Sequence, residues 1–386
     1  MAPELALASL KGLQEPSLVL DPMAGSGTVL RHASELGHRA IGFDMDPLAV
    51  LMSRAWITPV CDKEIQNMAE TVLTEADDLD GTELDLRWID DDLETREFTE
   101  YWFAPSQRND LRRISFVLDA LKGRDLNDQQ QAAADVIRVA LSRTIITKDR
   151  GASLARDVSH SRPHKVAENS DFDVIANFER SLRTVRQRLL TAPPARGASV
   201  TLGDARQINS IDDGLADLVL TSPPYLNAID YMRGHRLSLV WFGHTLGSLR
   251  RTRGQSIGAE RAPDNALYQP ELMAMRSAIG QVEDLPTRYQ GMILRYCGDV
   301  YRMISEIFRI LRIGGKAIIV VGNSCLKGIF VRNTEAISEA AGNIGLKLDD
   351  TRERELLLQN RYLPLTRCGA LGKRIRTETI MTFMKV

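Results

Sequence analysis

The chain has 386 residues, of which 44% are hydrophobic and 26% charged, a composition that is typical of globular proteins and excludes a disordered chain or a disulfide-stapled miniprotein. No uncharged apolar run reaches the roughly 18 to 20 residues that a membrane span needs, and the N-terminal stretch lacks the basic start of a secretory signal. Cys61, Cys297, Cys325 and Cys368 lie far apart, so we expect reduced thiols in a cytoplasmic protein and no metal site.

Charge is unevenly distributed, although the formal net charge is only −2. Residues 75–100 hold twelve acids against two arginines. Residues 141–165 carry six Lys/Arg against two Asp, and residues 231–261 carry six Arg against one Glu. Such runs are usually solvated faces. The two basic stretches can instead form a surface that follows phosphates, and the sequence leaves both interpretations open.

The first 60 residues alternate strand and helix patterns. We predict a short strand over 17–20, a glycine-containing loop, a helix over 29–37, a second strand over 39–44 and a helix that begins at Pro47. This order is typical of the opening half of a doubly wound parallel sheet.

The chain changes character after residue 60. Helical patterns cover 128–148 and 171–190, and the break TAPPARGAS follows them. We therefore predict a mostly helical insertion at 61–197, between core segments at 1–60 and 198–386.

The α/β pattern resumes in the C-terminal part of the chain. A long amphipathic helix is predicted over 288–315 and a shorter one over 334–345. The predicted strands of this part are 199–205, 216–225, 316–324, 347–358 and 377–386.

The loop after the first predicted strand reads Asp21-Pro-Met-Ala-Gly25-Ser-Gly27-Thr28. Gly25 and Gly27 have no Cβ, so the backbone can turn tightly and approach a ligand closely. The loop leads into a helix, where backbone N–H groups face a ligand. It matches neither a Walker A loop nor the complete GxGxxG signature. The alternative is a plain glycine turn.

Two acids follow predicted strands. Asp44 ends the second strand, where a carboxylate can accept both hydroxyls of a ribose, or can cap the helix at Pro47. Met45 beside it can pack on an adenine ring or belong to the core. Asp204, in the sequence GDAR, can accept a hydrogen bond from an adenine amino group or serve as a turn residue.

A second motif, Thr221-Ser222-Pro223-Pro224-Tyr225, ends an apolar strand. The prolines fix φ and remove two N–H donors, so nearby carbonyls are free to accept from a substrate amino group. Ser222 adds a side-chain oxygen, and Tyr225 offers a flat face on which a base can stack. A Pro-Pro strand exit without chemistry is the alternative.

Together, DPMAGSGT, GFDMDP, GDAR and TSPPY resemble the amino-methylating DNA methyltransferases that use S-adenosylmethionine. The resemblance covers about 1–60 and 198–386 and includes the closing strands. It implies a doubly wound, Rossmann-like class I methyltransferase sheet. It departs from many cytosine-N4 enzymes in motif order, because the cofactor motif here precedes the catalytic one.

The resemblance also implies residue roles. Asp21, Gly25 and Gly27 would hold the methionine end of the cofactor, Asp44 the ribose and Asp204 the adenine, with Met45 beside the ring. Ser222, Pro223, Pro224 and Tyr225 would be catalytic. The Ser variant of this tetrapeptide is commonest among cytosine-N4 enzymes, so cytosine N4 is favoured over adenine N6. Cytosine-C5 chemistry is disfavoured because no Pro-Cys motif is present.

Double-stranded DNA is the expected partner, with a cognate endonuclease or a defence-system subunit as a further partner and no membrane. The base must be flipped out of the duplex to reach such a site. Candidate phosphate contacts are Arg156, Arg162, Arg233, Arg236, Arg250, Arg251 and Arg253. Two alternatives stay open: the same chemistry on RNA, of the transfer-RNA guanine-N2 type, and an inactive nucleic-acid-binding module.

Overall fold

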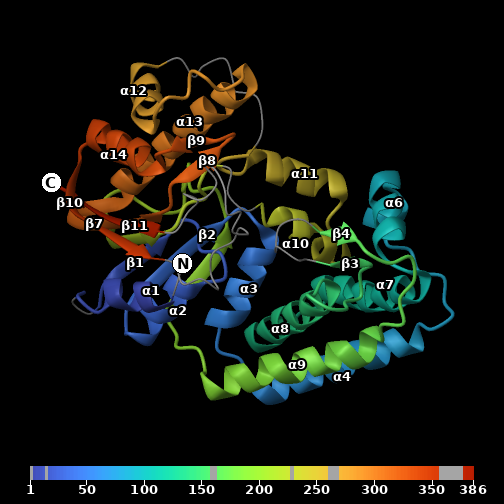
Figure 1. Ribbon diagram of the computed structural model, residues 1–386. Helices are drawn as coiled ribbons and strands as arrows, with labels where there is room; N and C mark the ends of the chain where they lie inside the picture. Colours follow the sequence, from blue (N-terminus) through green and yellow to red (C-terminus); the bar gives the residue numbers. More distant parts are fainter. Residues whose placement is uncertain (1–2, 14–15, 157–162, 227–229, 260–268, 356–376) are drawn as a thin grey trace. The chain divides into compact units, whose positions relative to one another are not determined.

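The computed structural model (Figure 1) describes residues 3–13, 16–156, 163–226, 230–259, 269–355 and 377–386. Within these ranges, no helix is both long and apolar enough to cross a membrane. The same part of the chain contains no group of three or more His, Cys, Asp or Glu side chains that could hold a metal ion.

The chain divides into two compact units. The first comprises Met1–Met45, Gly197–Ile229 and Gly254–Val386, and the second comprises Asp46–Arg196 and Asp230–Arg253. Relative to the boundaries expected from the sequence, the helix after Pro47 and the stretch from Asp230 to Arg253 pack within the second unit. That these units are separate domains, a methyltransferase core and a recognition insertion, stays a prediction.

The first unit is built on a seven-stranded sheet with the order β10-β11-β7-β6-β1-β2-β5. All neighbouring pairs from β7 to β5 are parallel, whereas β11 runs antiparallel to both β7 and β10. This order confirms the predicted doubly wound, Rossmann-like sheet. Its strands are β1 (Leu18–Asp21), β2 (Arg39–Asp44), β5 (Ala198–Leu202), β6 (Ala216–Thr221), β7 (Leu311–Val321), β10 (Leu346–Glu355) and β11 (Thr377–Lys385).

The central strands are continuous apolar runs because helices cover both faces of a parallel sheet. In β1 and β6 nearly every residue is buried. They pair in register, with Val19 opposite Leu218 and Leu20 opposite Val219. Because the two strands are parallel and aligned, their carboxyl ends lie at the same edge of the sheet.

Helices and a small hairpin complete the first unit. Helix α2 packs on β1, β2 and β5, and α13 packs on β7 and on α14. These elements are α1 (Pro3–Leu10), α2 (Thr28–Glu35), α12 (Pro270–Ile279), α13 (Thr287–Ile310), α14 (Asn333–Ile344), β8 (Ser324–Leu326) and β9 (Ile329–Val331). The predicted helix over 288–315 is too long at its C-terminal end, because strand β7 already begins at Leu311 and turns at Gly314, where φ is +75°.

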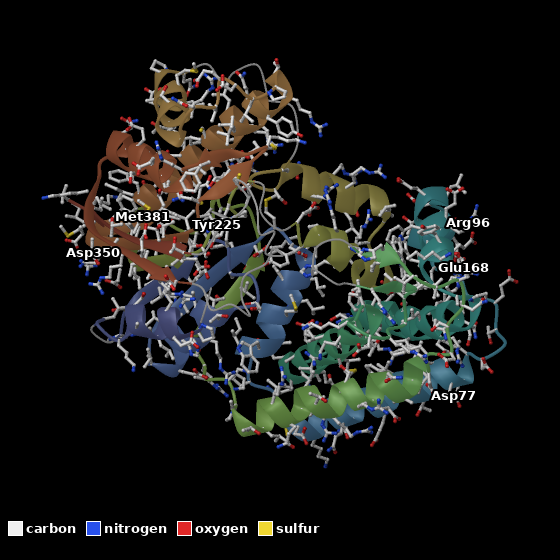
Figure 2. The ribbon with its side chains drawn as sticks, in the orientation of Figure 1. Asp77, Arg96, Glu168, Tyr225, Asp350 and Met381 are labelled. Atoms are coloured by element: carbon white, nitrogen blue, oxygen red, sulfur yellow. The ribbon has the colours of Figure 1, made fainter. Side chains whose placement is uncertain are left out.

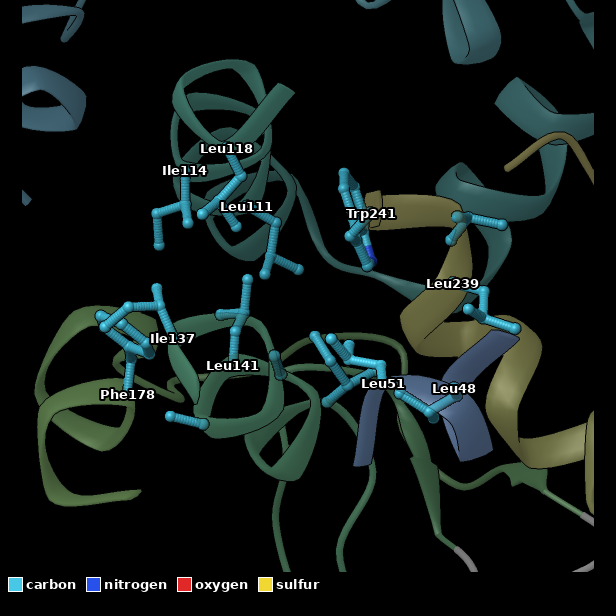
Figure 3. Packing of buried hydrophobic residues seen from close by; sticks show 14 of the residues in the cluster. Leu48, Leu51, Leu111, Ile114, Leu118, Ile137, Leu141, Phe178, Leu239 and Trp241 are labelled. Carbon is cyan, nitrogen blue, oxygen red and sulfur yellow. The ribbon is translucent and has the colours of Figure 1, made fainter. Parts of the chain in front are cut away.

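The second unit is almost entirely helical and has a core of its own. Figure 3 shows Leu111 and Leu118 of α7 facing Ile137 and Leu141 of α8, with Trp241 nearby. Its elements are α3 (Pro47–Ile57), α4 (Asp62–Asp78), α5 (Arg87–Asp90), α6 (Leu93–Trp102), α7 (Pro105–Ala120), η1 (Leu121–Gly123), α8 (Asp128–Ile145), β3 (Ala155–Arg156), β4 (His164–Lys165), α9 (Val174–Thr191), α10 (Met232–Leu239) and η2 (Val240–Phe242). Helix α11 (Leu246–Gln255) spans the boundary between the units.

Candidate active site

The glycine loop between β1 and α2 is held against the end of β2. The Ala24 amide donates to the Phe43 carbonyl at 2.8 Å, and the Gly25 amide donates to Asp44 Oδ2 at 2.8 Å. Gly25 has φ +53° and Gly27, the N-cap of α2, has φ +83°. L-residues rarely adopt such angles, so both positions favour glycine. Apart from Gly25 and its two chain neighbours, no described residue has a heavy atom within 4 Å of the point where a Cβ on Gly25 would stand, so this face of the loop is open to a ligand.

Asp44 ends β2, as predicted, and its carboxylate organises the glycine loop. Its carbonyl accepts from the Gly203 amide at 2.9 Å, which draws the turn after β5 to the same edge of the sheet. The alternative role of Asp44 as a helix cap is wrong. Asp46 is the N-cap of α3, and its Oδ1 accepts from the Leu48 amide at 2.9 Å.

Asp21 joins the carboxyl ends of β1 and β6. Its Oδ1 accepts a hydrogen bond from Thr221 Oγ1 at 2.8 Å and one from the Met23 amide at 3.2 Å. The carboxyl group is buried, and burial raises its pKa to about 6, with the nearby Asp44 charge adding to the effect and the Thr221 hydrogen bond opposing it. The first residue of the predicted catalytic motif is therefore bonded to the first residue of the predicted cofactor loop.

The tetrapeptide that follows β6 is anchored at both ends. Ser222 Oγ donates to the Val320 carbonyl of β7 at 3.0 Å. Tyr225, labelled in Figure 2, donates its hydroxyl to Glu378 Oε1 of β11 at 3.1 Å. Between them, Pro223 is buried and Pro224 is exposed. The serine and tyrosine side chains are thus held by the two strands that lie beyond β6 in the sheet.

Asp204 lies just after β5, and its carboxylate is hydrogen-bonded by Arg206, a residue that was not among the predicted site residues. Arg206 donates from Nε to Asp204 Oδ1 at 2.9 Å and from Nη2 to Asp204 Oδ2 at 2.6 Å. Burial disfavours the charged form of Asp204, but the hydrogen bonds from Arg206 lower its pKa below the usual value. Arg206 Nη2 also lies 4.0 Å from Met45 Sδ, which brings Met45 and Asp204 to one place.

Sequence reasoning also missed Asp299, a fully buried acid in the middle of α13. Arg206 Nη1 donates to its Oδ1 at 2.6 Å. An ionisable residue on the buried face of an amphipathic helix is a signal that the sequence does contain, because such residues are almost never fully buried unless they are paired. Its partner is 93 positions away, and the sequence alone does not identify it.

Three predicted nucleic-acid contacts gather at one place in the second unit. Arg233 Nε lies 3.1 Å and Arg253 Nε 2.5 Å from the same Asp230 Oδ2. The Arg236 guanidinium stands 5.1 Å from the centre of the Phe98 ring. Burial lowers the pKa of Arg236, and the charges of Arg253 and Arg233 lower it further. The cluster therefore carries three arginines against one nearby aspartate.

The other predicted contacts are dispersed. Arg250 forms an exposed ion pair with Glu94, and Arg156 Nε donates to the Asp149 carbonyl at 3.1 Å. Arg251 is exposed on α11. Arg162 lies outside the described residues. All of these contacts stay predictions.

The site lies at the topological switch point of the sheet. Strands β2 and β5 follow one another outward on one side of β1, and strands β6 and β7 follow one another outward on the other side, so the direction in which strands are added reverses next to β1. Ligands of open α/β sheets bind outside the carboxyl ends of the strands at such a point. The predicted cofactor and catalytic residues all lie here, with Asp21 and Asp44 as the last residues of β1 and β2 and the others in the loops that follow β1, β2, β5 and β6.

Comparison with known proteins gives low similarity throughout. No protein-family model matches the chain, and a search of curated proteins gives no match. Among solved structures, a SAM-dependent methyltransferase from Methanosarcina mazei is 10% identical over 100% of this chain and 98% of its own, with a TM-score of 0.34. A TehB-like SAM-dependent methyltransferase from Corynebacterium glutamicum is 10% identical over 100% and 89%, with a TM-score of 0.32.

A third structure is described as a proposed DNA modification methylase from Thermus thermophilus. It is 18% identical over 47% of this chain and 50% of its own, with a TM-score of 0.25. Scores this low carry no argument about activity. The fold rests on the strand order itself, and the function has to be argued from the site.

Proposed function

We propose that the chain is an S-adenosylmethionine-dependent methyltransferase that methylates an exocyclic amino group of a flipped DNA base, with cytosine N4 favoured over adenine N6. The observation that carries the proposal is the hydrogen bond from Thr221 to Asp21. A methyl transfer needs donor and acceptor sites side by side. This bond connects the ends of β1 and β6. The glycine loop begins at the end of β1, and the SPPY loop (Ser222–Tyr225) begins at the end of β6.

The chemistry of Ser222 supports an amine as the acceptor. A hydroxyl has one hydrogen to donate and lone pairs with which to accept. Because Ser222 gives its hydrogen to the Val320 carbonyl, its remaining capacity is to accept. Pro223 and Pro224 contribute no N–H. The loop is therefore suited to a substrate group that donates hydrogens, such as an exocyclic NH2.

The residues around the glycine loop fit the proposed cofactor. The open face at Gly25 allows close approach of a ligand to the backbone. Asp21 places a carboxyl group beside the loop for the cationic methionine end. Asp44 ends β2 for the ribose, and Asp204 lies just after the neighbouring strand β5 for the adenine. When bound, S-adenosylmethionine would supply a methyl group on a positively charged sulfur: the amine would form a bond to the methyl carbon as the carbon–sulfur bond breaks, leaving S-adenosylhomocysteine and releasing one proton to water.

The chain's own contribution to catalysis is orientation. The lone pair of an exocyclic amine is delocalised into the ring, so the amine is a poor nucleophile. Ser222 Oγ and the Pro223 carbonyl accept the two amine hydrogens, which favours a pyramidal nitrogen whose lone pair points at the methyl donor. Tyr225, fixed by Glu378, presents its ring for stacking of the flipped base. No covalent intermediate with the chain is required.

The arginine cluster around Asp230 supports a nucleic acid as the substrate. Arg233 and Arg253 share the Asp230 carboxylate, and Arg236, whose pKa is lowered by burial, lies close enough for their charges to lower it further, so positive charge remains for phosphates. Arg236 additionally packs on Phe98, which holds its side chain in place.

Transfer of tritiated methyl from S-adenosylmethionine to unmethylated genomic DNA, and in parallel to total transfer RNA, tests the proposal. We expect label on DNA, recovered as N4-methylcytosine after digestion to nucleosides. Label recovered as N6-methyladenine would change the target from cytosine N4 to adenine N6 and would leave the proposed DNA amino-methyltransferase activity in place. Label only on RNA, or no label on either nucleic acid, would contradict the proposal.

A second expected outcome concerns pH. Asp21 has a pKa raised to about 6, and a cationic ligand beside it favours the ionised form. Protonation below that pH removes the attraction, so the affinity for S-adenosylmethionine should fall by about tenfold between pH 7.5 and pH 5. Asp21→Asn keeps the acceptor for Thr221 and should bind more weakly at pH 7.5, with a nearly flat pH profile. Calorimetric titration at several pH values measures this. An unchanged slope in the variant would show that another group titrates.

A further inference from the structure

Asp299 is the centre of a buried ionic network in the first unit. This fully buried carboxylate accepts from Arg206 Nη1 at 2.6 Å and from Arg302 Nη2 at 2.8 Å, and Arg295 Nε lies 3.7 Å from it. Arg206 and Arg295 each expose only 10% of their side chains. Burying ions is unfavourable unless each is paired, so the fold maintains this network at a cost in desolvation.

Arg206 connects the buried centre to the candidate cofactor site. One edge of its guanidinium faces Asp299, and its Nε and Nη2 form a fork on the Asp204 carboxylate. Nη2 also donates to the Gln255 carbonyl at 2.7 Å. A guanidinium with this many fixed partners has little freedom, and bidentate pairing sets the plane of the carboxylate it holds.

A second set of contacts extends from Asp299 through Arg295 toward the SPPY loop. Arg295 donates to the Gly254 carbonyl at 3.0 Å and to the Ala259 carbonyl at 3.4 Å. Between these carbonyls lies Gly258, where a Cβ would stand 3.6 Å from the Tyr225 carbonyl oxygen. The stretch from Gly254 to Ala259 is thus held by the network and lies against the SPPY loop.

We propose that Arg206 is a positioning residue for recognition of the adenine amino group: anchored on Asp299, it fixes the Asp204 carboxylate so that one oxygen accepts from that amino group. This inference rests on the proposed function, because it takes the cofactor to be adenosine-based. The depressed pKa of Asp204 agrees with it, since the carboxylate stays ionised and remains an acceptor only. Arg206 itself touches neither the cofactor's reacting atoms nor the substrate amine.

The inference is tested with two ligands that differ at one group. Wild-type protein should bind S-adenosylhomocysteine at least about tenfold more tightly than its inosine counterpart, because an oxo group in place of the amino group leaves the carboxylate facing another acceptor. Arg206→Met removes the fork at similar length and should reduce this preference to within about twofold. A variant that binds S-adenosylhomocysteine less tightly but keeps the full preference over the inosine counterpart would overturn the inference.

Arg309→Met is the matched control. Arg309 lies on α13 and, like Arg206, donates to two carboxylates and a backbone carbonyl, those of Glu306, Asp213 and Ile211. In the part of the chain that the structure describes, it takes no part in the hydrogen bonds of Asp204 and Asp299. Its loss should change thermal stability without changing the preference between the two ligands. Wild-type protein that binds neither ligand would contradict the proposed function, whereas binding without preference would contradict only the role of Asp204 and Arg206.

Arg206→Lys keeps the test usable if Arg206→Met does not fold. A lysine retains the charge beside Asp299 but offers no planar fork to Asp204. We expect it to fold and to show a preference between those of wild type and Asp204→Asn. In the double variant Arg206→Lys/Asp204→Asn, the preference should equal that of Asp204→Asn alone, because Arg206 acts through Asp204. Additive losses would show that Arg206 acts by another route.

Discussion

Ser222→Ala should lower methyl transfer to DNA by about 100-fold or more while leaving the affinity for S-adenosylmethionine within about twofold. The hydroxyl accepts from the substrate amine in the proposed arrangement, and its own hydrogen is committed to the Val320 carbonyl. Alanine removes the acceptor and preserves the backbone course set by the two prolines. The loss should therefore appear in the rate of transfer at saturating cofactor.

The measurement is single-turnover transfer of tritiated methyl, with cofactor affinity determined separately by calorimetry. Ser305→Ala is a suitable control, because Ser305 Oγ likewise donates to a backbone carbonyl, that of Tyr301 at 2.9 Å, but lies within α13. Both variants lose one hydroxyl-to-carbonyl bond, which contributes about 1 kcal/mol to stability. Equal transfer rates in the two variants would remove Ser222 from the catalytic assignment.

The sequence was most informative where local pattern and position determine the structure. Strand β2 was predicted with its observed bounds, because RAIGFD is apolar, bounded by turn residues and followed by a proline that begins a helix. The glycine loop and the SPPY loop were predicted to follow strands, and in parallel strands this suffices to bring them to one edge. The fold class was accordingly within reach of the sequence.

Side-chain partners distant in the chain were not predictable in the same way. Nothing near Arg206 shows that it pairs with Asp299, because that contact depends on how α13 packs beside the loop after β5. The sharing of Asp230 by Arg233 and Arg253 depends equally on the geometry of α10 and α11. In the sequence these arginines form one charge run, and only the fold separates those that gather around one carboxylate from those that stand apart.

Helix caps show a similar limit at short range. Asp44 and Asp46 both precede the helix at Pro47, and either carboxylate has the right chemistry for an N-cap. The backbone decides between them, since Asp44 is still part of β2 while Asp46 has left it. The Asp44 carboxylate therefore remains available to the glycine loop, and it accepts a hydrogen bond from the Gly25 amide.

Gly25→Val should abolish measurable cofactor binding, with a loss of about 100-fold or more, because it adds a branched side chain on the face of the loop that is open to a ligand. The substitution also strains the backbone, since φ is +53° at this position. Strain of this kind costs of order 1 to 3 kcal/mol in stability and has to be separated from the effect on binding.

Gly214→Val separates the two effects. Gly214 lies in the same unit, has φ +68°, and likewise has no described heavy atom beyond its own and its chain neighbours' within 4 Å of the position of its missing Cβ. Both variants should therefore lose similar thermal stability, while only Gly25→Val should lose the cofactor. Calorimetric titration with S-adenosylhomocysteine and thermal unfolding of the two proteins give the comparison. If Gly25→Val binds as Gly214→Val does, the cofactor does not approach the loop at Gly25, and the donor site has to be sought elsewhere along this edge of the sheet.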